Sequence, residues 1–533
     1  VEPSVNSGSE IIGIMNLLML LSLVIAAWCV HRILVWNHVS GWFSVPFALC
    51  IAFLSPQVAR FTGHYALGYT FFVPASWLLI SAFQRFSKPW LTATLAILFV
   101  LAFAFIHPYY LFIYVIFMGA VVFWEALIAR FKLKSIENLI PRLATIVLPL
   151  LVFFIYQKMV DPFTDRPSNP YGMFSHMASF QSIFTPTAQP FNHLFHSYFF
   201  RLFIPTSWEG HAYIGMIAVF AAFSSFFPAF RKLKSRGVKL ITHPVLPSSL
   251  KQVFFPGIIT LLFAFGLFHN LGLAWAAEYL LPIKQFRSLG RVAWIFYYVI
   301  GVWTVFKLYS WFRLSKMHEK GRFSYPVILI LVASMFFWTL DAIVNIKFMK
   351  EQVLNKTASV GFSDVYVTEW KNAGVVLEDH EAILPLPMTL IGSEKIGLES
   401  GKQSLKHAMI GSFSTGLPII GGAMSRTSLR NTELTAQLVA NPLFPRDILH
   451  EMKDGFKLLF LSSREEKSVE ENRLISLADK VYENDEYELY SVATEEIKLM
   501  YAELAASIDE KSDTGNVVYL KPGEFELMEE TIW

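Results

Sequence analysis

The chain has 533 residues, of which 54% are hydrophobic and 16% aromatic, and only 16% carry a charge. Soluble domains carry roughly 25% charged residues, so this composition excludes an ordinary soluble protein and favours a chain embedded largely in lipid. The net charge of +3 conceals a division, because residues 1–345 hold 25 Lys and Arg against 10 Asp and Glu, whereas residues 346–533 hold 19 against 31. An acidic soluble part makes nucleic acid an unsuitable partner. Cys29 and Cys50 both fall in apolar runs, so no disulfide framework is predicted.

Apolar runs of membrane-spanning length fill residues 1–345. A hydrocarbon core of about 30 Å needs about 20 apolar residues per helix. Ten runs approach this length: Ile11–Val30, Gly41–Val58, Ala66–Phe83, Leu91–Ile106, Tyr109–Ile128, Leu143–Tyr156, His211–Phe230, Val253–Phe268, Val292–Trp311 and Tyr325–Ile343. The sequence therefore predicts an α-helical polytopic membrane protein with about ten transmembrane helices, in which the shorter runs are tilted, extended or re-entrant.

The connections between these runs differ in positive charge. Alternate connections hold 17 Lys and Arg, and the other connections hold seven: Arg60, Lys158, Arg166, Arg201, Lys284, Arg287 and Arg291. By the positive-inside rule the richer set is cytoplasmic. The amino terminus, the 157–210 and 269–291 loops and the acidic tail are then expected on the outer side.

Both ends of the sequence read as cut. The first ten residues, VEPSVNSGSE, begin without Met and resemble the end of an external loop, so we expect an upstream helix and loop. The closing segment GNVVYLKPGEFELMEETIW reads as β-strands without partners, so we expect the chain to continue there as well.

Histidines gather on the predicted outer side. Seven of the 14 lie at or near that face, together with four acids: His64, His107, His176, His193, His196, His211, His269, Asp161, Asp165, Glu209 and Glu278. Such crowding indicates a site, although amphipathic side chains also suit a membrane interface without any site. His193 and His196 have a ligand-like spacing, but no HExxH motif or partner cluster accompanies them, so a divalent metal stays an option and no cofactor is assigned.

The predicted external loop 157–210 is long, aromatic and poor in charge. This composition is typical of a segment that lies on a membrane surface or folds over a cleft, and an aromatic belt without substrate is the alternative. Asp161 and Asp165 lie four residues apart, and Glu209 precedes His211 at the next span. Each acid is a candidate proton acceptor, while helix capping is the commoner use of such residues.

A second basic segment, LLPIKQFRSLGRVAWIFYYVIGVW, precedes a predicted span. Arg287 and Arg291 are four residues apart, so they share one face if the helix begins early, and Lys284 adds a third cation. Two guanidinium groups at the start of a helix can grip a phosphate. Interfacial snorkelling is the alternative, but these cations lie on the side that the positive-inside rule disfavours.

The acidic tail alternates predicted strands and helices. Strands are expected at Ala382–Pro387, Lys457–Leu461, Tyr487–Val492 and Val517–Leu520, with helices at Ser428–Val439 and Glu465–Val481. After a linker over residues 351–364, this pattern predicts a soluble α/β domain within 346–512 and the start of a further β module over 513–533. The glycines of GSFSTGLPIIGGAMSR lack a strand–GxxxxGK–helix context and indicate a loop rather than a nucleotide site.

Four segments together resemble the GT-C class of polytopic glycosyltransferases and their bacterial relatives: FLSPQVARFTGHYALGYTFFVPASWLLI, FAFIHPYYLFIYVIF, QFRSLGRVAWIFYYV and the AILPLP strand that opens the tail. The resemblance implies an inverting enzyme of the bacterial inner (cell) membrane, with its carboxyl-terminal domain extracytoplasmic. It also implies transfer of a sugar from a polyprenyl-phosphate-linked donor to an acceptor on the outer side. The acidic motif of the class lies in the first external loop, where this sequence offers only Glu2 and Glu10.

The resemblance assigns roles to the polar residues. Arg287, Arg291 and Lys284 would hold the departing prenyl phosphate, with His64, His107, Tyr109 and His211 completing the substrate-binding set. Asp161, Asp165 and Glu209 are lesser candidates for the proton acceptor, behind an acidic motif expected upstream of Val1. The alternatives are a lipid or polysaccharide transporter or flippase, or a non-catalytic membrane scaffold. The sequence identifies neither the sugar nor the acceptor.

Overall fold

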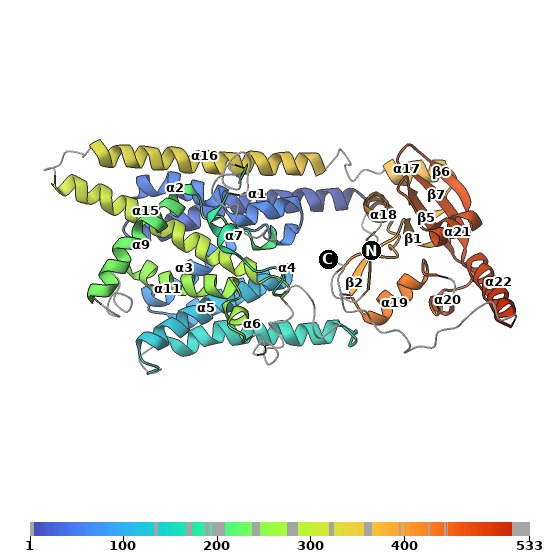
Figure 1. Cartoon of the computed structure of the whole chain (residues 1–533), viewed down its shortest axis with the longest axis horizontal. Coiled ribbons are helices and arrows are strands. Elements are labelled where there is room, and N and C mark those ends of the chain that lie inside the picture. Colours follow the sequence, from blue (N-terminus) through green and yellow to red (C-terminus); the bar gives the residue numbers. More distant parts are fainter. Residues whose placement is uncertain are drawn as a thin grey trace. The chain divides into compact units, whose positions relative to one another are not determined.

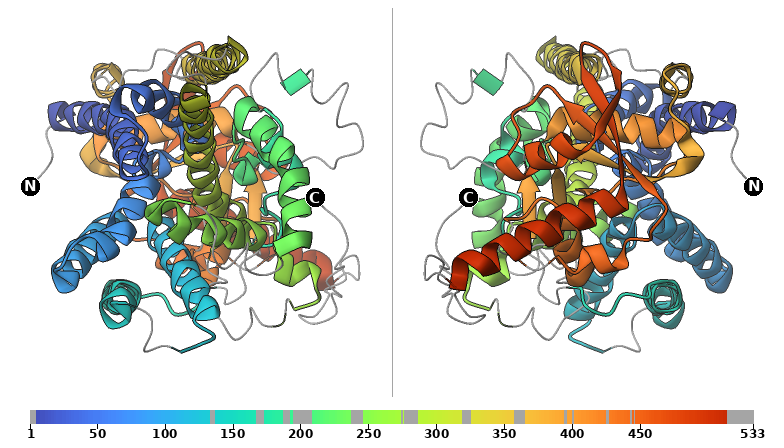
Figure 2. Two further views of the ribbon diagram at one scale, coloured as in Figure 1. Left: turned by 90° about the vertical axis from the view of Figure 1, so that its left-hand side faces the viewer. Right: turned by 90° about the vertical axis from the view of Figure 1, so that its right-hand side faces the viewer.

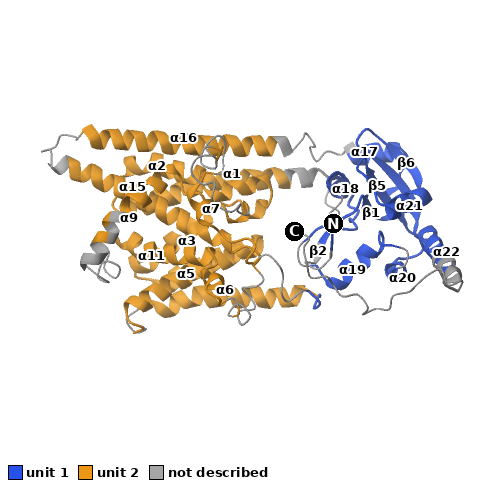
Figure 3. Ribbon diagram, in the orientation of Figure 1, with its two compact units in different colours: residues 1–10, 163–167, 360–533 blue, residues 11–162, 168–359 orange. Residues whose placement is uncertain are grey.

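A computed structural model of the chain describes residues 5–132, 137–166, 173–186, 192–193, 208–236, 246–273, 275, 286–318, 325–356, 365–393, 396–399, 401–424, 427–441, 444 and 446–513. The chain divides into two compact units (Figure 3). The larger unit comprises Ile11–Pro162 and Ser168–Ser359, and the smaller comprises Val1–Glu10, Phe163–Pro167 and Val360–Trp533.

The described part of the larger unit is helical (Figure 1). Its α-helices are α1 (Val5–Trp36), α2 (Gly41–Phe53), α3 (Phe72–Arg85), α4 (Pro89–Ile106), α5 (Pro108–Ile128), α6 (Leu139–Val160), α7 (Phe180–Phe184), α9 (Met216–Arg236), α11 (Ser248–Ala264), α12 (Leu267–Asn270), α15 (Ala293–His318) and α16 (Tyr325–Lys356). Four 3-10 helices connect them: η1 (Pro56–Thr62), η2 (Tyr65–Leu67), η4 (Trp208–Gly210) and η5 (Leu289–Val292). Pro89 and Pro108 open α4 and α5, where a missing N–H costs nothing.

Within the described residues, seven helices are long and apolar enough to cross a membrane, and α2 with η1 forms an eighth candidate bent by 42°. Two further apolar segments, Met216–Phe226 and Ser248–Ala264, are shorter than a span. Each of the ten predicted runs falls on a helix, but the predicted count of ten is not confirmed. The larger unit is that of a polytopic helical membrane protein.

Burial separates a central helix from peripheral ones. In α15 with η5, 89% of the most apolar window is buried, whereas in α6 and α16 the figure is 22%. Figure 2 shows α6 at the margin of the helices viewed end-on. Lipid covers the apolar residues of such peripheral helices, which explains why they expose so many large hydrophobic side chains.

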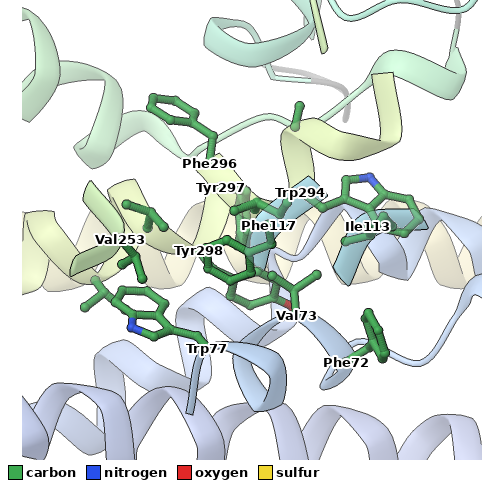
Figure 4. Close-up of a cluster of buried hydrophobic side chains, with 14 of the residues drawn as sticks. Phe72, Val73, Trp77, Ile113, Phe117, Val253, Trp294, Phe296, Tyr297 and Tyr298 are labelled. Carbon is green, nitrogen blue, oxygen red and sulfur yellow. The ribbon is translucent and has the colours of Figure 1, made fainter. Parts of the chain in front are cut away.

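The core around α15 is aromatic (Figure 4). Trp77, Trp294 and Tyr298 are fully buried there. A buried tyrosine hydroxyl needs hydrogen-bond partners. The hydroxyl of Tyr298 donates to the Thr70 carbonyl at 2.8 Å and lies 2.9 Å from the Ser55 hydroxyl, which can donate to it. These bonds hold the bend between α2 and η1 against α15.

The smaller unit has two sheets. The first has the order β1-β5-β7-β6, with β1 parallel to β5 and the other neighbours antiparallel, and the second has the order β3-β2-β4. The strands are β1 (His380–Leu386), β2 (Thr389–Ser393), β3 (Ile396–Glu399), β4 (Gly422–Ala423), β5 (Lys457–Ser463), β6 (Asp479–Glu483) and β7 (Tyr487–Ala493). The helices are α17 (Val365–Asn372), η6 (Leu377–Asp379), α18 (Lys402–Thr415), α19 (Leu429–Gln437), α20 (Ile448–Glu451), α21 (Val469–Leu477) and α22 (Thr494–Asp513).

Three predicted tail strands correspond to β1, β5 and β7, and one predicted helix corresponds to α19. The helix predicted over Glu465–Val481 is shorter, because Ser468 caps α21 and the chain after Leu477 enters β6. The predicted linker begins too early, because α16 continues to Lys356. The strand predicted at Val517–Leu520 and all but the first residue of the 513–533 module lie outside the described residues.

Candidate functional site

Glu209 lies at the centre of a buried charged cluster in the larger unit. Its Oε2 is 2.7 Å from Arg291 Nε, 2.6 Å from Arg291 Nη2 and 3.3 Å from Arg60 Nη1. Arg60 Nη2 also donates to the Glu209 carbonyl oxygen at 3.2 Å. The side chains of Arg60, Arg291 and Glu209 are 1%, 6% and 9% exposed. Two guanidinium groups on one carboxylate leave a net positive charge in a buried place, which an anionic ligand would neutralise.

Three short helices carry these residues. Arg60 lies on η1. The N-cap residue of η1 is Ser55, whose side chain accepts a hydrogen bond from the backbone N–H of Gln57. Glu209 lies on η4 and Arg291 on η5. η1 is bent by 42° from α2, whereas η5 runs into α15 as one candidate span. The side chains of Arg60 and Arg291 are both buried.

Two glycines let η4 and η5 meet. A Cβ atom on Gly290 would lie 2.5 Å from the Cα of Gly210, and a Cβ atom on Gly210 would collide with the carbonyl of Met177. The backbone N–H of Gly290 donates to the His176 carbonyl at 2.9 Å. Only residues without a side chain permit this approach, which places Glu209 beside Arg291.

Aromatic rings cover both arginines. The guanidinium carbon of Arg291 lies 4.1 Å from the centre of the Tyr109 ring, and that of Arg60 lies 4.3 Å from the Trp208 ring and 5.7 Å from the Trp294 ring. The attraction of a cation to a ring face strengthens where water is excluded. The Tyr109 hydroxyl accepts a hydrogen bond of 2.7 Å from the backbone N–H of Ser288, which fixes the ring.

Two histidines adjoin the cluster. His64 Nε2 lies 3.5 Å from Glu209 Oε1, its ring stacks on Trp208 with centroids 5.4 Å apart, and its side chain is 45% exposed. His107 caps α5, accepting a hydrogen bond from the Tyr109 N–H. Burial lowers the pKa of His64, and burial with the nearby Arg291 lowers the pKa of His107 to about 4. Both imidazoles are therefore neutral at neutral pH.

The charge of Glu209 is strongly fixed. Burial by itself would raise its pKa, but Arg60 and Arg291 outweigh burial and lower the pKa below its ordinary value. A carboxylate that binds two cations and rarely accepts a proton is a poor general base. Its geometry suits the orienting of arginines, which differs from the proton-acceptor role predicted for it.

A cavity of about 310 Å³ adjoins the cluster. It lies between η1, η4 and the last turns of α16, and Arg60 and Trp208 belong to both the cavity wall and the cluster. The other lining residues are Leu54, Ser55, Pro56, Ala59, Thr62, Asn192, His211, Tyr213, Asn345, Phe348, Met349 and Gln352. This volume falls at the lower end of the range of small-molecule sites.

The structure brings together most of the residues predicted from sequence. Five of them lie in or beside the charged cluster: Glu209, Arg291, His64, His107 and Tyr109. His211 lines the adjoining cavity. Arg60 and Trp208 were missed as site residues. The signal was present for Arg60, because it is a cation on the side that the positive-inside rule disfavours.

Other predicted residues lie elsewhere. η5 begins only at Leu289, so half-buried Arg287 precedes it and does not share a helical face with Arg291. Lys284 lies outside the described residues. Asp161 is the C-cap residue of α6.

Asp165 belongs to the smaller unit and caps α19. Its Oδ2 accepts hydrogen bonds from the Arg430 N–H at 2.9 Å and from Ser428 Oγ at 2.7 Å. These bonds lower its pKa. Capping, the alternative considered for this acid, is the role that its contacts support.

Metal binding finds no geometric support in the part of the chain that the structure describes. No group of three or more His, Cys, Asp or Glu side chains there could hold an ion. Of the predicted pair, His193 is described, whereas His196 lies outside the described residues.

Fold and site define an integral membrane protein with a polytopic helical unit and a buried arginine–glutamate cluster. Residues 2–335 match one protein family, described as "Domain of unknown function (DUF6311)". Because this match spans more than half of the chain, the protein belongs to that family. The matched residues 2–335 include Arg60, Glu209 and Arg291. No curated protein and no solved structure matches the chain.

Proposed function

We propose that this protein is an inverting membrane glycosyltransferase of GT-C type. In this proposal it moves a sugar from a polyprenyl-phosphate-linked donor to an acceptor on the extracytoplasmic side of a bacterial inner membrane. The observation that carries the proposal is the cluster of Arg60, Glu209 and Arg291, a buried net positive charge in a helical membrane unit. Buried ionisable groups in such units are costly and usually functional.

The arginines suit a departing phosphate. As the acceptor hydroxyl attacks the anomeric carbon, the bond from that carbon to the phosphate oxygen breaks and its electron pair passes to the phosphate. Negative charge then grows on the phosphate oxygens, and fixed guanidinium groups offset it without rearrangement. Glu209 holds both arginines in place and prevents the two cations from repelling each other.

His64 is the group best suited to take the proton of the acceptor hydroxyl. It is half-exposed and neutral at neutral pH, and it adjoins Glu209, whose negative charge would stabilise the imidazolium that forms. Glu209 is less suited to this role because it is paired with two arginines, and Asp165 because it caps α19. Of the three acids predicted as proton acceptors, Asp161 is the one that is left after Glu209 and Asp165.

The test uses detergent-solubilised protein with a mixed pool of polyprenyl-phosphate sugars and outer-surface acceptors. We expect release of prenyl phosphate without any membrane gradient, and a loss of at least about tenfold in Arg60→Gln and Arg291→Gln, since one charge-assisted contact is worth roughly 1.5–3 kcal/mol. His64→Gln should lower kcat more than it raises KM.

Arg142→Gln is the matched control. Arg142 is also a buried arginine, paired with Glu125 near the far end of α5, about 24 Å along that helix from Tyr109. It should lose stability as the site variants do, yet keep its specific activity. Gradient-dependent movement of an intact lipid-linked sugar in vesicles, with no turnover in detergent, would instead favour a flippase, and neither activity would favour a scaffold.

A further inference from the structure

One face of α16 lines the cavity. Asn345, Phe348, Met349 and Gln352 follow the spacing i, i+3, i+4 and i+7, so they project from the same side of the helix, and all four contribute to the cavity wall. Two amides thus lie on a helix that is otherwise mostly lipid-exposed. Such polar groups are costly in an apolar helix unless they have a ligand or a partner.

The two amides keep unused hydrogen-bonding capacity. Asn345 Nδ2 donates to the Phe53 carbonyl at 3.1 Å. The Oδ1 atom of the same side chain has no hydrogen bond within the described residues. The Gln352 amide makes no hydrogen bond to any described residue. Trp208 lines the same cavity and is 49% exposed. Amides beside an indole ring can hold the hydroxyl groups and the apolar C–H face of one ligand.

The described residues of the cavity wall carry little charge. Among its described residues none is Asp, Glu or Lys, and the single arginine, Arg60, directs its guanidinium to Glu209. The proposed function assigns the surplus charge of Arg60 to the donor phosphate, so a carboxylate or an amine on the sugar would find no counter-charge of its own among these residues. An acyl or prenyl chain would bury the amides of Asn345 and Gln352 without partners. A neutral, hydroxyl-rich ligand satisfies both conditions.

We propose that this cavity binds an uncharged sugar ring, with Asn345 and Gln352 as hydrogen-bonding groups and Trp208 as the aromatic wall. The inference rests on the proposed function, because it identifies the cavity as the place of the glycosyl group whose phosphate meets the arginines. It adds that the transferred sugar carries neither a carboxylate nor an amine.

The experiment measures binding to the full chain in detergent by native mass spectrometry. The probes are farnesyl phosphate, farnesyl-phosphate-linked glucose, galactose and mannose, and the corresponding uronic acids. At least one neutral hexose should bind about tenfold more tightly than farnesyl phosphate and than its own uronic acid, an effect of the size expected for one or two hydrogen bonds. Gln352→Leu should abolish that preference and leave farnesyl phosphate binding unchanged.

Gln157→Leu is the control, since it removes an exposed amide near the end of α6, away from the cavity. Gln352→Glu is a second variant. It keeps the size of the side chain, so its effect does not depend on a loss of stability, and it should weaken binding of the neutral hexose. Equal binding of hexose, uronic acid and bare phosphate would overturn the inference and leave the proposed function standing. No binding of any probe to the wild type would sink both.

Discussion

Glu209 is shared unequally between its two arginines. Arg291 contacts one carboxylate oxygen through two nitrogens at 2.6 and 2.7 Å, whereas Arg60 stands at 3.3 Å from it. Arg291 is therefore the better neutralised cation. In the proposed reaction the surplus charge that attracts a phosphate lies mainly on Arg60, a residue to which the sequence-based prediction gave no role.

The pH dependence of stability follows from three depressed pKa values. Glu209 has a pKa below its ordinary 4.5, and His64 and His107 have pKa values below 6.5. Each group binds protons less readily when folded, so the unfolded chain takes up more protons as the pH falls, and stability falls with it. We expect the apparent melting temperature in detergent to decline from pH 7, first through the histidines and below about pH 4.5 through Glu209.

Glu209→Gln separates the contributions. At pH 7 it should cost about 3–5 kcal/mol, because two buried cations lose their counter-charge, and the decline below pH 4.5 should become shallower. Glu209→Gln with Arg291→Gln should recover part of the loss. A melting temperature that rises on acidification, or a single variant as stable as the wild type, would contradict the geometry of the cluster.

At the scale of elements, the apolar runs and polar patterns of the sequence predicted most helices and strands, because these elements depend on neighbouring residues. The apolar runs became helices because the backbone must satisfy its own hydrogen bonds in lipid. Ser55-Pro56 marks the break between α2 and η1, which the single run Gly41–Val58 concealed. In the tail, Ser468 and Glu471 form a capping box that starts α21 later than the pattern of apolar residues suggested.

The site was less predictable, because its contacts join distant elements. Arg60 and Glu209 are 149 positions apart, and Glu209 and Arg291 are 82 apart. Spacing could suggest a pair such as Arg287 and Arg291 but not a partner on another helix. The close packing of Gly210 on Gly290 brings η4 against η5, which carry Glu209 and Arg291, and a single sequence gives no signal of that packing.

One helix of the smaller unit starts without a cap of its own. Gly401 at the start of α18 offers no side chain, and the Glu465 carboxylate instead accepts the N–H groups of Lys402, Gln403 and Ser404 at 3.0–3.3 Å. We expect Glu465→Gln to loosen this first turn by about 1 kcal/mol, the usual worth of a cap. Hydrogen exchange at those three amides should then quicken about fivefold. Glu466→Gln, an exposed neighbour with no described contact, should leave the exchange unchanged, and equal effects of both variants would refute the role of Glu465.

For the whole molecule, the charge division in the sequence lies close to the division into compact units. The basic part ends near residue 345, and the larger unit extends to Ser359 because α16 carries on past the last apolar residues. The short segment Phe163–Pro167 belongs to the smaller unit although it lies far from the tail in sequence. Composition could reveal that one part of the chain suits lipid and the other water. It could not reveal that Phe163–Pro167 belongs to the smaller unit, since the Asp165 contacts to α19 form only on folding.

The orientation of the chain is the last prediction, and it rests on the 17 Lys and Arg in one set of connections against seven in the other. Cys29 and Cys50 are both buried, so replacing them by Ala gives a background for single-cysteine labelling. A membrane-impermeant maleimide should label Pro170→Cys and Val469→Cys in intact cells, because the 157–210 loop and the tail are expected outside, and Val469 is 74% exposed. Lys234→Cys should react only after permeabilisation. Labelling of Val469→Cys only in permeabilised cells would reverse the orientation and put the Arg60–Glu209–Arg291 cluster at the cytoplasmic face, where no extracytoplasmic acceptor could reach it.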